Sequence, residues 1–345
     1  MSVEEIIKSK RLSDFRGTPE GQSGGKYVRE LEMAFRERFG IKHAVAMNSA
    51  TSALHASLIA CGVGRGDEVI VSPFSFASSA SCALMIGAKP VFVDIDPETY
   101  CIDPKLVDKA ITKKTKAIIP VHLFGHPANT DYKECNSNIA IIEDAAQAIG
   151  AEDNGLAGTK GACGIFSFNQ SKHINTGEGG MLITDDDKIA RIVRAVRNHA
   201  ESSDPTLEIV GYNYRLGEIE ALLALQQLQE LDTQLLNRRI MVSTLESGFE
   251  REDIPYKKIS RAIKHACWMF AFKVKNREEV YEKCKAKGVI LNKGYNEPLY
   301  RLPIFDVTDY SQFPVTERMW NEELLVIQVA DLTLDACQVI IDSVV

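Results

Sequence analysis

Three short segments of the chain carry side chains whose types and spacing could support chemistry on one common ligand. Residues 48–54 are mostly small or polar and open a predicted helix after a strand, where backbone N–H groups favour a phosphate. Residues 141–147 end an apolar run at Asp144, and a carboxylate at a buried strand end is costly unless it has a partner. Residues 164–180 place Lys172 shortly after an apolar strand and before a glycine-rich turn.

Each segment alone also has an ordinary structural explanation. Ser49 or Thr51 could simply cap the helix, Glu143 with Asp144 could form an acidic strand end, and lysines in loops are usually solvated. Together they suit pyridoxal phosphate (PLP), whose phosphate, ring nitrogen and aldehyde carbon each need a protein group. An aspartate keeps the ring nitrogen protonated, and a partly dry lysine forms a Schiff base. The order of the segments therefore predicts a PLP site.

The elements that must position these groups alternate along residues 42–186. Helical stretches at residues 51–61, 77–85 and 104–111 separate short apolar, β-branched runs, which lie at residues 68–72, 90–94, 116–122 and 139–144. Near-continuous apolar strands between helices predict a mostly parallel sheet covered on both faces. Ligands bind such sheets at the carboxyl ends of the strands, which is where the three segments fall.

The remainder of the chain predicts a second, smaller unit. A strand at residues 181–184 leads into a helix over about 187–200, and a long helix over 217–249 could link two domains. Beyond about residue 251 the pattern changes to α+β, with two strands and a helix expected at residues 265–274, 325–329 and 277–287. We therefore expect a large α/β domain over residues 1–240 and a small α+β domain over residues 241–345.

The composition restricts the class of protein. The 345 residues are 45% hydrophobic and 25% charged, as is ordinary for a soluble globular chain. The net charge of −7 gives no basic field for nucleic acid or an acidic membrane, and no apolar run approaches membrane-spanning length. The eight cysteines include no Cys-x-x-Cys pair, so neither disulfides nor a metal site is expected. No signal peptide is expected at the N-terminus, and we interpret the protein as cytoplasmic.

Several motifs occur in a fixed order along the chain. They are Gly66-Asp-Glu-Val-Ile70, Pro73-Phe-Ser-Phe76, Val121-His-Leu-Phe-Gly125, Glu143-Asp-Ala-Ala-Gln147, Phe166-Ser-Phe-x-x-x-Lys172, Thr176-Gly-Glu-Gly-Gly180 and Gly211-Tyr-Asn-Tyr-Arg215. In this combination they resemble the DegT/DnrJ/StrS family, the sugar aminotransferases among fold type I PLP enzymes. The resemblance runs from about residue 24 to residue 239 and continues weakly to the end. It implies the fold of aspartate aminotransferase, with a mostly parallel central sheet and a smaller C-terminal α+β domain.

The resemblance also implies a role for each matching residue around the cofactor ring. Lys172 would form the Schiff base and later shuttle a proton between the substrate carbon and the cofactor. Asp144 would pair with the ring nitrogen, and Gln147 would hydrogen-bond the ring hydroxyl. Phe76 would stack on the ring face, with ordinary core packing as the alternative.

Further residues would hold the phosphate and line the substrate pocket. The phosphate would be bound by Ala50, Thr51, Ser167 and, from a neighbouring subunit, Asn213. This arrangement implies a homodimer with shared active sites. Tyr214 and Arg215 would lie near the substrate, or would make a hydrogen bond at the interface. His122 is a further candidate for the substrate pocket, with a structural role as the alternative.

The lysine bears on the reaction class. Relatives that dehydrate sugars carry histidine at the lysine position, whereas here Lys172 is present and His173 is one residue off. The resemblance therefore favours transamination. An amino acid, expected to be L-glutamate, would convert PLP to PMP (pyridoxamine phosphate). A nucleotide-linked 3- or 4-keto-deoxysugar would then take the amino group, as amino-sugar biosynthesis requires. A PMP-dependent dehydratase and a non-catalytic regulatory protein of the same fold are the alternatives.

Two positions and one longer segment depart from the family's pattern. Ala50 stands where the family usually has glycine, which is tolerable if its φ is negative. Ala200, after His199, stands where the family commonly has glycine. Residues 291–305, where the family often places an Arg-Pro or a histidine that lines the sugar pocket, have neither. The motifs therefore do not define which sugar is bound.

Overall fold

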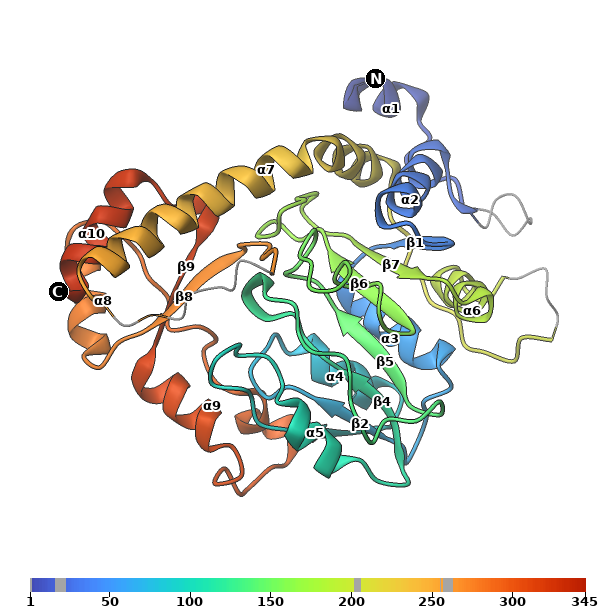
Figure 1. Cartoon of the computed structure of the whole chain (residues 1–345). Coiled ribbons are helices and arrows are strands. Elements are labelled where there is room, and N and C mark those ends of the chain that lie inside the picture. Colours follow the sequence, from blue (N-terminus) through green and yellow to red (C-terminus); the bar gives the residue numbers. More distant parts are fainter. Residues whose placement is uncertain (1, 16–22, 202–205, 255, 257–262) are drawn as a thin grey trace.

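The computed structural model describes residues 2–15, 23–201, 206–254, 256 and 263–345. Within these residues a seven-stranded sheet forms the centre of the molecule (Figure 1), in the order β1-β7-β6-β5-β4-β2-β3. The strands are β1 (His43–Met47), β2 (Glu68–Val71), β3 (Lys89–Phe92), β4 (Thr115–Ile119), β5 (Ala140–Asp144), β6 (Cys163–Ser167) and β7 (Gly180–Thr184). The strands pair in parallel except at β7, which runs antiparallel to both of its neighbours. The predicted, mostly parallel sheet is confirmed.

Helices cover both faces of this sheet, as the alternating pattern predicts. On one face, α3 (Ala50–Ala60), α4 (Ser78–Met85) and α6 (Asp187–Arg197) share an apolar core with the strands. On the other face lie α2 (Lys26–Phe39), α5 (Pro104–Ala110) and the first half of α7 (Glu218–Arg251). The short helix α1 (Val3–Ser9) projects from this body and buries Ile6 in the core beneath α7 (Figure 1).

The direction of the strands brings the chemistry-bearing segments to one edge of the sheet. β2, β4, β5 and β6 are parallel, and β1 shares their direction because both β1 and β6 are antiparallel to β7. The carboxyl ends of these five strands therefore lie along one edge. The loops that leave them carry residues 48–49, 72–77, 120–126, 145–151 and 168–179.

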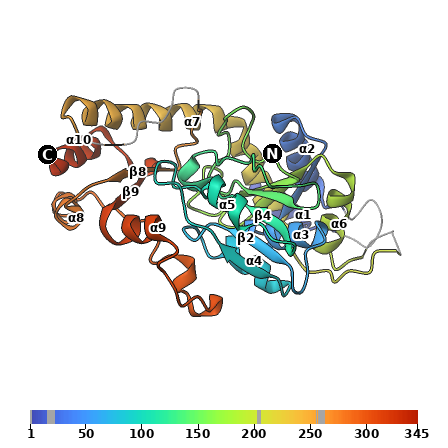
Figure 2. The ribbon, with the colours of Figure 1, turned by 60° about the horizontal axis from the view of Figure 1, so that its bottom comes forward.

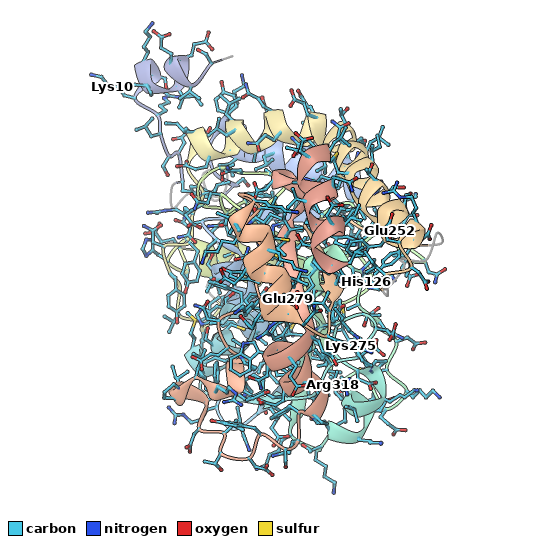
Figure 3. The ribbon with its side chains drawn as sticks, turned by 90° about the vertical axis from the view of Figure 1, so that its left-hand side faces the viewer. Lys10, His126, Glu252, Lys275, Glu279 and Arg318 are labelled. Carbon is cyan, nitrogen blue, oxygen red and sulfur yellow. The ribbon has the colours of Figure 1, made fainter. Side chains whose placement is uncertain are left out.

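A smaller unit is built on the second half of α7, which runs along the molecule and reaches both units (Figures 1 and 2). β8 (Met269–Lys273) and β9 (Leu324–Gln328) pair antiparallel. One face of this pair packs with α7, α8 (Arg277–Ala286) and α10 (Leu334–Val344). Figure 3 views this end, with Glu279 on α8 and Arg318 at the end of α9 (Pro314–Arg318). Because α7 continues through residue 240, the expected division there stays a prediction.

The turn after α6 is strained. The helix ends at Arg197, three residues before the expected end, and His199 and Ala200 take positive φ angles of 58° and 55°. This region costs an L-residue roughly 1–2 kcal/mol. A Cβ on Gly211 would lie 1.9 Å from the backbone nitrogen of Ala200, so the two chain segments meet closely here. Ala200 therefore occupies a conformation that a glycine would adopt without strain.

Candidate active site

The turn after β6 carries Lys172 to the carboxyl edge of the sheet. The amine of Lys172 lies 3.7 Å from the centre of the Trp268 ring. Burial lowers the pKa of Lys172 to about 8, and the charge of Asp144 partly opposes this shift. A lysine with such a pKa is partly neutral near physiological pH, which is the state that attacks a carbonyl carbon.

The lowered pKa gives a testable pH dependence. We expect the cofactor-free protein to capture PLP at a rate that rises with pH through a midpoint near 8, because only the neutral amine attacks the aldehyde. Stopped-flow absorbance of the lysine-bound cofactor across a pH series measures this rate. Capture of PLP by free methylamine in the same buffers controls for the ionisation of PLP itself. A midpoint near the ordinary lysine pKa of about 10.4 would contradict the buried setting of Lys172.

Asp144 is the last residue of β5 and is buried. Its Oδ2 accepts a hydrogen bond from Ser79 Oγ at 2.7 Å, and its Oδ1 accepts one from the N–H of Ala146 at 3.2 Å. Burial raises the pKa of Asp144, while the Ser79 hydrogen bond and the charge of Lys172 oppose the rise. A cation beside this carboxyl would hold it ionised, so the position suits a protonated pyridine nitrogen.

Gln147 lies three residues further on and has a fixed orientation. Its Oε1 accepts from the N–H of Phe124 at 2.7 Å, and its Nε2 donates to the hydroxyl of Tyr295 at 2.8 Å. Since a backbone N–H can only donate, the amide oxygen must face Phe124 and the NH₂ group must face Tyr295. Gln147 can therefore offer a cofactor hydroxyl oxygen the second N–H of its Nε2.

The start of α3 forms the end of the site where a phosphate is predicted. Ser49 caps the helix, with its Oγ accepting from the N–H of Ser52 at 3.0 Å. The N–H groups of Ala50 and Thr51 are in the first turn and so lack intrahelical partners. Ala50 is the first helical residue and its φ is not positive, so its methyl group is tolerated there.

Gly180 brings Ser167 beside the start of α3. In the sheet Gly180 pairs with Met47 on one side and with Ser167 on the other. A Cβ on Gly180 would lie 2.6 Å from the backbone nitrogen of Ala50, so a side chain here would fill the space beside the helix end. The structure thus places two of the predicted phosphate-binding residues, Ala50 and Ser167, beside one glycine, and Thr51 follows Ala50 in the first turn of α3.

These groups fit PLP. A helix N-terminus suits its phosphate, Asp144 suits its ring nitrogen, Gln147 suits its ring hydroxyl and Lys172 suits its aldehyde. When bound, PLP supplies a ring that accepts electrons from a substrate carbon. Phe76 lies in the loop just before α4 and is 63% exposed, and a flat ring against it would cover this apolar surface.

Both ring nitrogens of His122 are hydrogen-bonded within the protein, so they are not available to a substrate. Its Nδ1 accepts from the N–H of Ala128 at 2.8 Å, so the ring proton is on Nε2, which donates to Glu143 at 3.0 Å. Both side chains are buried. Burial would raise the pKa of Glu143, but bonds from His122 and from backbone N–H groups lower it. This geometry gives His122 a structural role and does not support the substrate contact that the sequence suggested.

Asn213, Tyr214 and Arg215 lie beside the start of α3. The carbonyl of Asn213 accepts from Asn48 Nδ2 at 3.3 Å, and its side chain is exposed. The hydroxyl of Tyr214 is 3.0 Å from His55 Nδ1, and Arg215 Nη1 donates to Asn198 Oδ1 at 3.0 Å. Tyr214 and Arg215 thus contact their own chain, and their predicted contact with a substrate stays a prediction.

Three contacts that complete the site come from residues that the sequence did not single out. These residues are Ser79, Tyr295 and Trp268. The need of a buried carboxylate for a donor could have pointed to Ser79, which follows the Pro73–Phe76 motif. Tyr295 lies in the segment that departs from the family, and Trp268 lies in an expected strand. Tyr295 contacts Gln147, 148 positions away in the sequence, and Trp268 contacts Ser171, 97 positions away, and no local pattern predicts contacts over such separations.

The comparison with known proteins decides the family. The sequence matches the DegT/DnrJ/EryC1/StrS aminotransferase family over residues 6–345. The chain belongs to this family. Its PLP cofactor, its fold type I architecture and its activity as a sugar aminotransferase agree with what the motifs implied.

Individual relatives agree with this assignment. The chain is 38% identical over 282 residues to the GDP-perosamine synthase of Caulobacter vibrioides, covering 77% of this chain and 76% of that protein. A solved aminotransferase of the family from Brucella abortus has a TM-score of 0.88 at 27% identity, covering 99% and 92%. A GDP-4-keto-6-deoxymannose-3-dehydratase has a TM-score of 0.86 at 26% identity, covering 99% and 96%. Aminotransferases and dehydratases thus share this fold, so the reaction class must be argued from the residues of the site.

Proposed function

We propose that this aminotransferase moves an amino group from L-glutamate onto the keto carbon of a nucleotide-linked 4-keto-6-deoxyhexose. The observation that carries the proposal is the pair formed by Lys172 and Asp144. Their charges act on each other at the sheet edge, and burial lowers the pKa of the amine to about 8. Similarity to a GDP-perosamine synthase and to a protein named for GDP-4-keto-6-deoxymannose supports the sugar class.

Each residue of the site has a definite task in this proposal. Lys172 binds the cofactor and moves a proton between the substrate carbon and the cofactor. Asp144 keeps the ring nitrogen protonated, and Ser79 holds Asp144 in place. Gln147 donates an N–H to the ring hydroxyl, and Phe76 covers one ring face. The phosphate is held by Ala50, Thr51 and Ser167.

The surroundings of Lys172 favour transamination over dehydration. His173 is buried, and its Nε2 donates to the carbonyl of Ala266 at 2.8 Å. Burial lowers the pKa of His173 to about 3, so the ring is neutral. His173 is therefore engaged with the backbone and is not placed to replace Lys172 as the base, whereas the resemblance implies a histidine at the lysine position itself in a dehydratase.

We further propose that the enzyme acts in the cytoplasm as a homodimer with shared sites. The exposed Asn213 lies beside the phosphate end of the site, where a second subunit could receive its side chain. Within the described residues no helix is both long and apolar enough to cross a membrane. The large and small domains would occupy residues 1–240 and 241–345, with α7 spanning the boundary.

A screen of nucleotide-linked keto-sugars with L-glutamate tests the proposed reaction. GDP-4-keto-6-deoxymannose is the first compound to test, and glutamate carrying a heavy-nitrogen label in its amino group identifies the transferred atom. Mass spectrometry should show a sugar whose ketone has become a labelled amine, together with 2-oxoglutarate. Reactions without glutamate should show no change. A sugar that loses water and gains no label would establish the dehydratase alternative instead.

A further inference from the structure

The indole of Trp268 contacts both the amine of Lys172 and the peptide beside it. The amine lies 3.7 Å from the centre of the ring. The indole Nε1 donates to the carbonyl of Ser171, the residue before the lysine, at 2.7 Å. Trp268 is itself buried. One rigid side chain thus touches the reactive group and fixes the backbone that carries it.

The close approach of two chain segments sets the position of Trp268. A Cβ on Gly125, whose φ is +101°, would lie 3.0 Å from the nitrogen of Cys267 and 3.1 Å from that of Trp268. The N–H of Ala266 donates to the carbonyl of Gly125 at 2.9 Å. The chain before β8 is therefore docked on the turn after β4, although these segments are far apart in the sequence.

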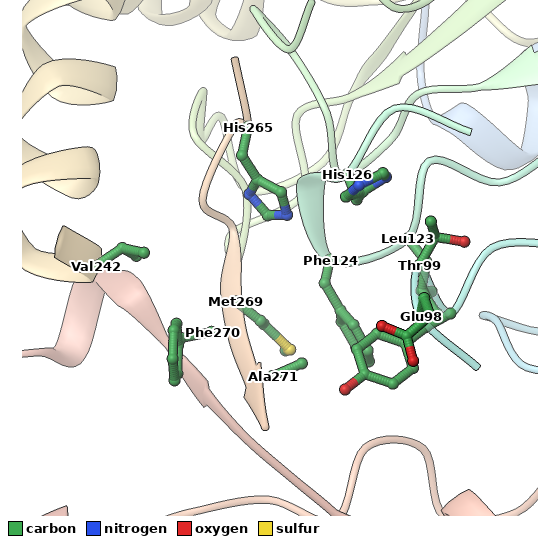
Figure 4. Close-up of a pocket in the computed structure, with 11 residues that line it drawn as sticks. Glu98, Thr99, Leu123, Phe124, His126, Val242, His265, Met269, Phe270 and Ala271 are labelled. Carbon is green, nitrogen blue, oxygen red and sulfur yellow. The ribbon is translucent and has the colours of Figure 1, made fainter. Parts of the chain in front are cut away.

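Packing at this junction leaves Trp268 little freedom. A cavity of about 40 Å³ lies between the two units, lined from the large unit by residues such as His126 and Phe124 and from β8 by Met269 and Ala271 (Figure 4), and Trp268 is not among its lining residues. The indole lies in the apolar cluster that joins the two units, with Phe74 and Val326 among its members.

The contact between the Lys172 amine and the indole of Trp268 is attractive when the amine is charged. An ammonium group over an aromatic face is attracted by the ring's negative π surface, and tryptophan gives the strongest such contact. Burial disfavours the charged amine, whereas Asp144 favours it. The other titratable group beside Lys172 is His173, which is neutral. The indole face and Asp144 therefore act together to keep the buried amine protonated and in place.

We propose that Trp268 is a positioning residue for Lys172, holding the unbound amine as an ammonium on its indole face. This inference rests on the proposed role of Lys172 as the cofactor-binding lysine. Trp268 holds the amine before the cofactor arrives and again when the amine is released during turnover. By favouring the ammonium, it also raises the pH at which the amine becomes reactive. The small unit thereby takes part in the chemistry of a lysine in the large unit.

Fluorinated tryptophan tests the proposal without changing the shape of the site. The chain has two tryptophans, so Trp320→Phe leaves Trp268 as the single labelled position. Fluorine withdraws charge from the ring face and weakens its attraction for a cation. The pH midpoint of PLP capture should therefore fall stepwise with added fluorine, by about half a unit to one unit overall. Fluorescence of Trp268 should also be quenched as PLP is captured.

The matched control places the label at the other tryptophan. In Trp268→Phe, fluorination of Trp320 should leave the midpoint unmoved, because Trp320 contacts Arg301 and Asn296 instead. A midpoint that does not respond to fluorination of Trp268, or that responds equally in the control, overturns the proposal. Peptide mapping after reduction distinguishes an error in the role of Trp268 from an error in the proposed function. If the proposed function is wrong, Lys172 carries no cofactor label; if only the role of Trp268 is wrong, Lys172 is still labelled.

Discussion

Replacing Lys172 by alanine is expected to abolish turnover and to remove the covalent bond between protein and cofactor. The amine has two tasks, binding the aldehyde and transferring a proton, and among the residues that the structure describes we expect no neighbour to take over either. His173 is neutral and donates to the carbonyl of Ala266. We expect the rate to fall by more than about 10⁴-fold. Activity with the keto-sugar and the absorbance of the lysine-bound cofactor measure the two effects.

Two controls separate loss of the amine from loss of the fold. Lys188→Ala removes an exposed lysine on α6 and should leave both readouts unchanged. Added methylamine should restore part of the rate of the Lys172→Ala variant, because a free amine can then supply the missing proton acceptor. A Lys172→Ala enzyme with normal rate would refute the assignment of the lysine.

The second large effect is expected at Asp144. Asp144→Asn keeps the size of the side chain and an oxygen that can accept from Ser79 but removes the negative charge, and Asp144→Ala removes the whole group. Without the charge the ring nitrogen loses its proton and the bound ring becomes a poorer acceptor of electrons. We expect both variants to lose roughly 10²-fold or more in kcat, about 2.7 kcal/mol of transition-state stabilisation.

Spectra distinguish this effect from simple loss of cofactor. The Asp144→Asn protein should still bind PLP covalently through Lys172, so its absorbance band should persist while the rate falls. Asp335→Asn, at an exposed residue in the first turn of α10, provides the matched control and should leave the rate and the absorbance unchanged. A near-normal rate in Asp144→Asn would show that the carboxylate is not needed to keep the ring electron-accepting.

The framework of the site was predictable because it depends on local patterns. Short apolar runs between helices indicated the strands, and a carboxylate at the end of one run indicated a buried acid in need of a partner. Asp144 ends β5 and Lys172 follows β6, and these two strands run in the same direction, so the meeting of the two residues at one sheet edge follows from the alternation itself. The order of elements, the parallel sheet and the long helix α7 are confirmed on the same basis.

The predicted bounds of two strands are wrong where a proline or a turn interrupts the apolar pattern. The expected strand over residues 116–122 ends at Ile119, just before Pro120, which has no N–H to continue the ladder. The expected strand over residues 265–274 begins only at Met269. Before it, Cys267 takes a positive φ of 54° and donates its N–H to His265 Nδ1 at 2.8 Å. Apolar composition alone cannot reveal such a turn.

The groups that the small unit contributes could not be predicted for a different reason. Tyr295 and Trp268 reach the site through long-range packing: the backbone of Leu299 donates to the carbonyl of Pro73, and Ala266 donates to Gly125. A Cβ on Gly294 would lie 2.8 Å from the ring of Phe74, so this segment can approach only with glycine there. The positions of Tyr295 and Trp268 depend on how the two units pack against each other, and the periodicity of the sequence does not predict this packing.

The most direct test of the account is to locate the cofactor on the chain. The purified protein is saturated with PLP, reduced with borohydride to make the bond permanent, digested, and mapped by mass spectrometry. The account predicts one pyridoxyl group, on the peptide that contains Lys172, and none on that peptide in the Lys172→Ala variant. A label on a different lysine, or no label at all, would contradict it.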